Sequence, residues 1–119
     1  MKPKKILIGD DNTEFLTSFS RALRRLEIEV DTATTPDEVT AKAQKTRYDK
    51  IVTDLDYTDG GAEGYQVLQE IKNLAPIRVL YTARAGVEGV KQEAERNGAT
   101  HVINKSDVSG LMRLLKEEK

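Results

Sequence analysis

Short apolar runs alternate with amphipathic segments along the whole chain, and this alternation constrains the fold more than any other feature. Four short runs are typical of buried strands, at residues 6–8, 51–52, 77–81 and 102–103, and the alternation of apolar and acidic residues over 28–31 predicts an edge strand with one solvent-exposed face. The segments that follow them carry apolar residues at helical spacing, as in residues 13–26. Five such units predict an α/β fold, in which helices cover both faces of a parallel sheet.

Residues typical of helix starts mark several of these segments. Asp11 or Asn12 is suited to cap a helix over residues 13–26, and Thr35-Pro36 combines a capping threonine with proline at the first helical position. The fourth helix is expected over residues 87–97, although its apolar stripe is short and two glycines lie near its start.

Composition excludes several classes of function. The chain has 119 residues, which predicts a single domain over residues 1–119, and its 19 basic and 20 acidic residues leave a net charge of −1. That balance argues against a nucleic-acid binder that works by bulk charge, and against a polybasic membrane-surface module. Without cysteine, and with His101 as the single histidine, disulfides, thiolate metal sites and multi-histidine metal sites are impossible. No signal peptide or membrane span is apparent, so we expect a cytoplasmic protein, and His101 is expected in an exposed loop.

Polar side chains follow four of the five predicted strands. They are Asp10 and Asp11 after the first strand, Asp54 and Asp56 after the third, Thr82 after the fourth and Lys105 after the fifth. The carboxyl ends of parallel strands meet at one edge of the sheet, where ligands bind in folds of this kind. Carboxylates gathered there repel one another, and Mg²⁺ is the favoured cation because it takes one or two carboxylates and leaves room for a phosphate oxygen.

This set of residues, in this order and on these strands, resembles the receiver domain of two-component response regulators over essentially the whole chain. The resemblance implies a flavodoxin-like, doubly wound sheet of five parallel strands in the order 2-1-3-4-5, with five helices. It implies that Asp54 accepts a phosphoryl group from a sensor histidine kinase or a phosphotransfer protein. The domain is then a phosphoacceptor rather than an enzyme, and we expect self-phosphorylation from small phosphodonors and autodephosphorylation.

The resemblance also assigns roles to the neighbouring residues. Mg²⁺ is expected on Asp11 most directly, on Asp10 through water, on Asp54, and on the backbone carbonyl of Asp56. Thr82 and Lys105 are expected to hold the phosphoryl oxygens and to shift the surface around the fourth helix and fifth strand, which changes the binding of an unknown downstream partner.

The loop after Asp54 departs from the family pattern. A proline four residues after the acceptor and a glycine eight residues after it are usual, whereas Thr58 and Ala62 stand there. We interpret Gly64 as the equivalent glycine, which implies a two-residue insertion.

Three further departures concern the strand ends. Ser106 follows Lys105 in place of the usual proline, which leaves the isomer of that peptide bond open. Val102 occupies the position of the aromatic switch residue, so coupling through a swinging ring is not expected. Gly9 stands where a branched apolar residue usually precedes the acidic pair.

One hypothesis goes beyond the family pattern. Asp56 lies two residues after the acceptor, and Arg84 lies two residues after Thr82. We expect the two side chains to pair at the mouth of the site and to modulate dephosphorylation by limiting the access of water or a partner.

Other functions remain open at this stage. Residues 54–58 resemble the D-x-D-x-T motif of haloacid-dehalogenase-type phosphatases, but the acidic pair then precedes the nucleophile instead of following the lysine. A flavodoxin-like FMN binder is disfavoured because Asp10 and Asp11 would repel its phosphate. A receiver-like interaction module that is never phosphorylated is the third alternative. The chain ends at Lys119, soon after the last predicted helix, so we expect a domain that acts alone or a fragment of a longer protein.

Overall fold

A computed structural model describes residues 4–117 of the chain. Strands and helices alternate in the order β1 (Lys5–Gly9), α1 (Thr13–Arg24), β2 (Glu29–Ala33), α2 (Pro36–Lys45), β3 (Lys50–Thr53), α3 (Gly64–Ile71), β4 (Ile77–Thr82), α4 (Val90–Arg96), β5 (His101–Asn104) and α5 (Val108–Lys116). All pairings are parallel, and the strand order β2-β1-β3-β4-β5 confirms the predicted fold class. Within these residues no helix is long and apolar enough to cross a membrane.

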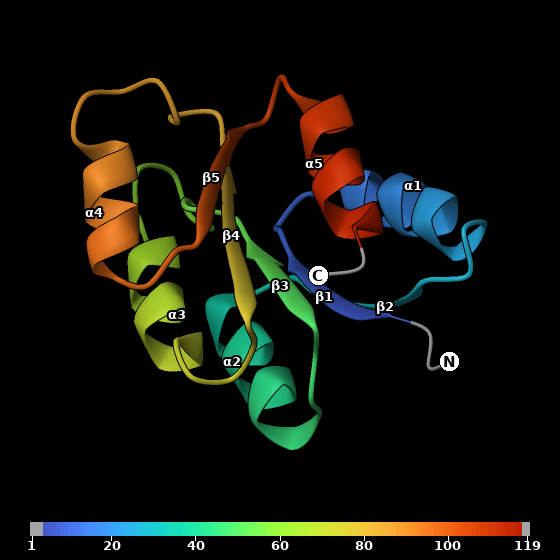
Figure 1. Ribbon diagram of the computed structural model, residues 1–119. Helices are drawn as coiled ribbons and strands as arrows, with labels where there is room; N and C mark the ends of the chain where they lie inside the picture. The colour runs from blue at the N-terminus through green and yellow to red at the C-terminus, as the bar shows by residue number, and fades with distance from the viewer. Residues whose placement is uncertain (1–3, 118–119) are drawn as a thin grey trace.

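The helices form a layer on each side of the sheet (Figure 1). Strand β1 shows why, because its successive side chains point to opposite faces. Ile6 and Ile8 belong to the core beneath α1 and α5, whereas Leu7 belongs to the core beneath α2 and α3. All three are at most 1% exposed. A strand buried on both faces must be apolar at every position, which explains the continuous apolar runs in the sequence.

The expected helix starts are largely present. Of the two candidate caps, Asn12 performs the role in α1, since its side-chain oxygen accepts the Phe15 N–H at 3.0 Å. Thr35 caps α2 in the same way, through the Glu38 N–H. Helix α1 ends at Arg24, two residues before the expected end.

The start of α4 was predicted wrongly. The helix begins at Val90 rather than at residue 87, and Gly89 precedes it in a left-handed conformation with φ of +87°. Val87 is 51% exposed and does not contribute to the buried face. Left-handed backbone cannot continue a right-handed helix, so the glycine moves the start to the next residue. His101 is exposed as expected, but it is the first residue of β5 rather than part of a loop.

Candidate functional site

The register of the sheet brings the first and third strand ends together. Gly9 pairs with Thr53, and the Asp54 N–H donates to the Gly9 carbonyl at 3.0 Å, so Asp10 and Asp54 leave neighbouring strands side by side. Asp10 is 1% exposed and Asp54 is 6% exposed, whereas Asp11 lies on the surface. One carboxylate oxygen from each of the three lies within 4.8 Å of the other two. This all-oxygen, carboxylate-rich set fits a hard divalent cation such as Mg²⁺.

Lys105 joins the two buried carboxylates. Its Nζ donates to Asp10 Oδ2 at 2.9 Å and to Asp54 Oδ2 at 3.0 Å. The backbone of Lys105 is held beside the end of β4, because its N–H donates to the Thr82 carbonyl at 3.1 Å. The structure therefore brings the lysine and both aspartates into one cluster, with Thr82, 1% exposed, on the adjoining strand end.

Burial and charge shift the pKa values of this cluster. Burial, followed by the nearby negative charge of Asp10, raises the pKa of Asp54 to about 6, although the Lys105 ammonium acts in the opposite direction. For Lys105, burial lowers the pKa, but its hydrogen bonds to Asp10 and Asp54 outweigh burial and raise it. Lys105 is thus charged at neutral pH, and the cluster carries excess negative charge next to a single ammonium group.

Tyr81 supports Lys105, a role that the sequence did not reveal. The Tyr81 hydroxyl donates to the Lys105 carbonyl at 3.0 Å, and the Lys105 Nζ lies 5.9 Å from the centre of the Tyr81 ring. A cation at that distance from an aromatic face is attracted to it. In the sequence, Tyr81 is indistinguishable from the other buried residues of its strand.

A second group of contacts surrounds the backbone of Asp54. The Thr53 hydroxyl donates to the Asp54 carbonyl at 2.9 Å and lies 2.8 Å from the Tyr57 hydroxyl. The Tyr57 side chain packs against Gly9, where a Cβ atom would overlap the tyrosine hydroxyl and a methyl group of Val39. This contact explains why the branched residue expected before the acidic pair is replaced by glycine.

The loop after Asp54 is organised by two carboxylates. Glu63 accepts the N–H groups of Tyr57 and Thr58 at 3.0 and 3.3 Å, and Asp56 Oδ1 accepts the Ala62 N–H at 2.9 Å. The loop ends at Gly64, where a Cβ would overlap the Asp54 carbonyl oxygen. The close approach gives a physical reason for the glycine that we interpreted as the family equivalent. The role of Glu63 was missed because its partners, two backbone N–H groups and the Thr58 hydroxyl, carry no charge that marks a pair in the sequence.

The Asp56 carboxylate pairs with Arg84 and is not one of the three clustered carboxylates. Arg84 Nε donates to Asp56 Oδ2 at 2.9 Å, and Nη2 donates to Asp56 Oδ1 at 2.8 Å, which makes the pair bidentate. The Arg84 N–H also donates to the Thr82 hydroxyl at 3.1 Å. The pair therefore ties the loop after β3 to the loop after β4, directly beside Thr82.

The structure also describes two other positions that depart from the family pattern, Ser106 and Val102. The described residues contain no cis peptide bond, so the Lys105–Ser106 bond is trans. Val102 is half-buried and packs against the core beneath α3 and α4. A branched aliphatic side chain there has no ring to swing between an inner and an outer position.

Comparison with known proteins identifies the family. The family model of the response regulator receiver domain matches residues 6–116. The chain belongs to this family. No curated protein matches the chain significantly in sequence.

Solved structures of receiver domains share the fold. Chemotaxis protein CheY4 of Vibrio cholerae is 27% identical, with a TM-score of 0.81 and coverage of 97% of this chain and 98% of that one. The receiver domain of a Pseudomonas aeruginosa sensor histidine kinase, with magnesium coordinated in its active-site cleft, is 23% identical, with a TM-score of 0.79 and coverage of 97% and 96%. A Burkholderia pseudomallei response regulator with a phosphorylated aspartic acid, calcium ion and citrate is 24% identical, with a TM-score of 0.79; the match covers 95% of this chain and 66% of that one.

Proposed function

We propose that this receiver domain accepts a phosphoryl group on Asp54 from a phosphohistidine of a sensor histidine kinase or a phosphotransfer protein, in the cytoplasm. The observation that carries the proposal is the Lys105 ammonium, held at 2.9 and 3.0 Å between two buried carboxylates. Receiver-family membership supplies the reaction class, and the Asp54 carboxylate, which Lys105 and the Leu55 N–H hold in place, is the proposed nucleophile.

In the proposed reaction, an oxygen of the Asp54 carboxylate attacks phosphorus. The new P–O bond forms as the P–N bond to the donor imidazole breaks, and the electron pair of that bond stays on the imidazole nitrogen. The product is an acyl phosphate on Asp54. The other carboxylate oxygen, Oδ1, accepts the Leu55 N–H at 2.8 Å, which keeps the group oriented during the attack.

Lys105 and Thr82 are the proposed partners of the transferred group. Lys105 already donates to Asp54 Oδ2, so a small movement of its Nζ brings it to a phosphoryl oxygen. The Thr82 hydroxyl accepts the Arg84 N–H, which leaves its own proton available for a phosphoryl oxygen. Both contacts strengthen as negative charge develops there.

Mg²⁺ fits the site as its cofactor. Asp10, Asp11 and Asp54 supply carboxylate oxygens close enough for one ion, with Asp11 and Asp54 as the proposed direct ligands and Asp10 acting through water. The Asp56 carboxylate is paired with Arg84, and its backbone carbonyl is the remaining proposed ligand. When bound, the ion neutralises charge on the carboxylates and on the incoming phosphoryl oxygens.

The proposed output is a change in the surface around α4 and β5. Thr82 is the last residue of β4 and Lys105 follows β5, so their movement toward a phosphoryl group displaces the β4–α4 loop and the β5–α5 loop. Helix α4 has only 7 residues and no side-chain cap at its start, so few local interactions stabilise it. A downstream partner that distinguishes the two surfaces reads the phosphorylation state.

The Asp56–Arg84 pair is the proposed modulator of dephosphorylation. It closes a bridge between two loops beside the site, and a water molecule that attacks the acyl phosphate must pass these loops. Loss of the bridge is expected to shorten the lifetime of the phosphorylated form.

Incubation with Mg²⁺ and acetyl phosphate, followed by intact mass measurement, tests the central proposal. The wild type is expected to gain one phosphoryl group, whereas Asp54→Asn gains none. Asp59→Asn, at an exposed position of the same loop, is the matched control and is expected to behave as the wild type. Absence of a mass gain with both acetyl phosphate and a panel of active histidine kinases would refute phosphoacceptance and favour an interaction module. Turnover of a generic phosphate monoester would instead favour a phosphatase.

A further inference from the structure

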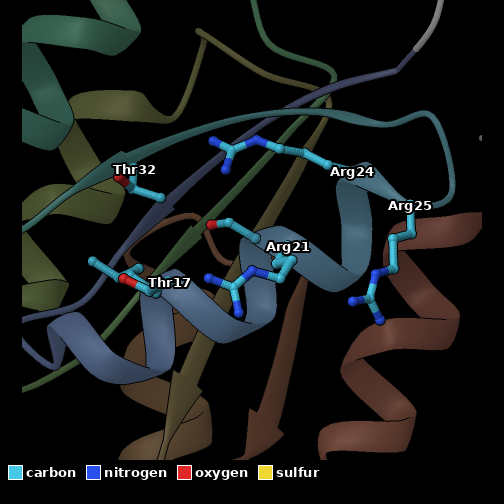
Figure 2. A pocket seen from close by; sticks show the side chains of 7 residues that line it. Thr17, Arg21, Arg24, Arg25 and Thr32 are labelled. Atoms are coloured by element: carbon cyan, nitrogen blue, oxygen red, sulfur yellow. The ribbon is translucent and has the colours of Figure 1, made fainter.

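A groove of about 450 Å³ lies between α1 and β2, a strand at the edge of the sheet (Figure 2). Its polar lining consists of hydroxyl and guanidinium side chains, from Thr17, Ser20, Thr32, Arg21, Arg24 and Arg25. The volume falls within the range of small-molecule sites in proteins. Donor groups thus dominate a cleft that contains no carboxylate.

The arginines of this groove have no acidic partners. Across residues 4–117, no carboxylate lies within 4.0 Å of their guanidinium groups, although Arg84 and Arg96 both form ion pairs. Arg24 Nη2 donates to the Val30 carbonyl at 2.9 Å, which anchors the side chain and leaves most of its five N–H donors unused. Figure 2 shows Arg21 extending on the same side of α1 as Thr17, whereas Arg25 extends away from both threonines. Arg21 and Arg24 are therefore the pair that serves the groove.

Ser20 provides an independent observation. It is 2% exposed, and within the described part of the chain its Oγ is the only buried side-chain nitrogen or oxygen without a hydrogen-bond partner. A buried hydroxyl with no partner destabilises a fold, and a missing ligand is one explanation for such a group. This particular hydroxyl lies in the lining of the arginine groove.

A purely structural role explains only part of this arrangement. Arg21 and Arg24 lie in the last turn of α1, where positive charge stabilises the helix dipole. That role does not account for the unpartnered Ser20 hydroxyl or for the two threonine hydroxyls beside it.

An extended peptide is a poor occupant of the groove. The Ala33 carbonyl accepts the Asp10 N–H across to β1, so by alternation the carbonyls of Val30 and Thr32 point to the open edge of β2. Arg24 and Lys42 already donate to these two carbonyls, which prevents the addition of another strand. Clustered hydroxyls and paired guanidinium groups instead suit phosphate oxygens, which accept bidentate hydrogen bonds from arginine.

We propose that this groove is a binding site for a small molecule that carries a diphosphate group. Arg21 and Arg24 each bind one phosphoryl unit, Thr17 and Thr32 donate to the outer oxygens, and Ser20 gains the acceptor that it lacks. A diphosphate is favoured over a single phosphate because two guanidinium groups and three hydroxyls line the cleft. The site involves none of the residues that surround Asp54.

Calorimetric titration in EDTA, without divalent cations, tests this site with inorganic pyrophosphate and with ADP as separate probes. Amide chemical shifts then locate the binding. We expect saturable binding, at least about tenfold tighter than that of sulfate at equal ionic strength, with shifts centred on Thr17, Ser20 and Thr32. Tighter binding of ADP than of pyrophosphate assigns the site to nucleotides, and equal binding assigns it to the diphosphate group alone. Tighter binding of an oligoglutamate peptide, or no saturable binding of either probe, overturns the proposal.

Variants separate the site from general charge effects. Arg21→Gln combined with Arg24→Gln is expected to weaken binding by at least about tenfold. Arg113→Gln, which removes an exposed arginine from the last turn of α5, is the matched control and is expected to leave binding unchanged. Equal weakening in the control variant overturns the proposal. Asp54→Asn is expected to retain full binding, so failure of the phosphoacceptor proposal and failure of this one are distinguishable.

Ser20→Ala gives a direct test of the unpartnered hydroxyl. Without a probe present, loss of an unsatisfied buried group raises the thermal midpoint. With pyrophosphate, the same variant is expected to bind roughly tenfold more weakly, because one donor to a charged acceptor is lost. A raised midpoint with unchanged pyrophosphate affinity would mean that Ser20 is a packing residue, and it would overturn the assigned site.

Discussion

Replacement of Asp54 by asparagine is expected to stabilise the metal-free protein at neutral pH. Burial and the neighbouring Asp10 charge raise the pKa of Asp54 from 3.8 to about 6. At about 1.36 kcal/mol per pH unit, that difference corresponds to a cost on the order of 3 kcal/mol for the ionised carboxylate in the folded state. Asparagine keeps the shape of the side chain and removes the charge. Because Lys105 loses an ionic partner at the same time, we expect a net gain of about 1–3 kcal/mol in the free energy of unfolding.

The pH dependence follows from the direction of this shift. The pKa of Asp54 is higher in the folded state than in the unfolded state, so the folded protein binds more protons between about pH 4 and pH 6. The wild type therefore loses stability relative to the variant as the pH rises through this window. The full difference is present above about pH 6, and it disappears below about pH 4, where both states carry a protonated carboxyl.

Urea unfolding in EDTA at several pH values between 4 and 7.5 measures this difference, with equal m-values as the check on two-state behaviour. Asp59→Asn is the control, because it removes an exposed aspartate five residues after Asp54. The reasoning is refuted if Asp54→Asn is no more stable than the wild type at pH 7.5. A gain that persists undiminished at pH 4 would refute the electrostatic cause, since no charge remains there to be removed.

Three further predictions follow from the same geometry. Mg²⁺ is expected to raise the thermal midpoint of the wild type by relieving carboxylate repulsion, and Asp11→Asn is expected to weaken that response in a calorimetric scan. Gly9→Ala is expected to destabilise the fold by about 1–3 kcal/mol in urea, because the new methyl group overlaps Tyr57 and Val39; a loss below the error of the assay would contradict the close contact. Arg84→Gln is expected to shorten the lifetime of phosphorylated Asp54, measured by the decay of radiolabel, and an unchanged lifetime would remove the proposed modulating role.

The fold and the cluster of Asp10, Asp54 and Lys105 were predictable because both depend on the regular alternation of strands and helices along the chain. Apolar runs spaced by amphipathic segments define five strand–helix units, and the residue after each strand falls at the same edge of a parallel sheet. Asp10, Asp54 and Lys105 were therefore placed together without knowledge of any contact. Their assigned functions in phosphoryl transfer stay predictions until the mass measurement is made.

The features that escaped the sequence depend on contacts with no regular spacing. Tyr81 supports Lys105 through a backbone carbonyl, and Glu63 orders its loop through two backbone N–H groups. Tyr57 fills the space above Gly9, so the glycine is meaningful only together with a residue on another element. The start of α4 was missed because the backbone angle of Gly89, rather than apolar spacing, determines it.

Backbone contacts hold Asp10, Asp54 and Lys105 in place, and the charges of these three side chains explain why such contacts are needed. Two buried carboxylates beside one ammonium repel each other, and an unconstrained loop would separate them to reach water. Here Asp10 and Asp54 leave paired strands, while the Lys105 backbone is fixed by Thr82 and Tyr81. The sheet therefore keeps the unfavourable charges together. A cation that binds there relieves this repulsion, and the relieved repulsion adds to the free energy of cation binding. A site that destabilises the free domain in this way responds to its ligands more strongly than a neutral pocket of the same shape.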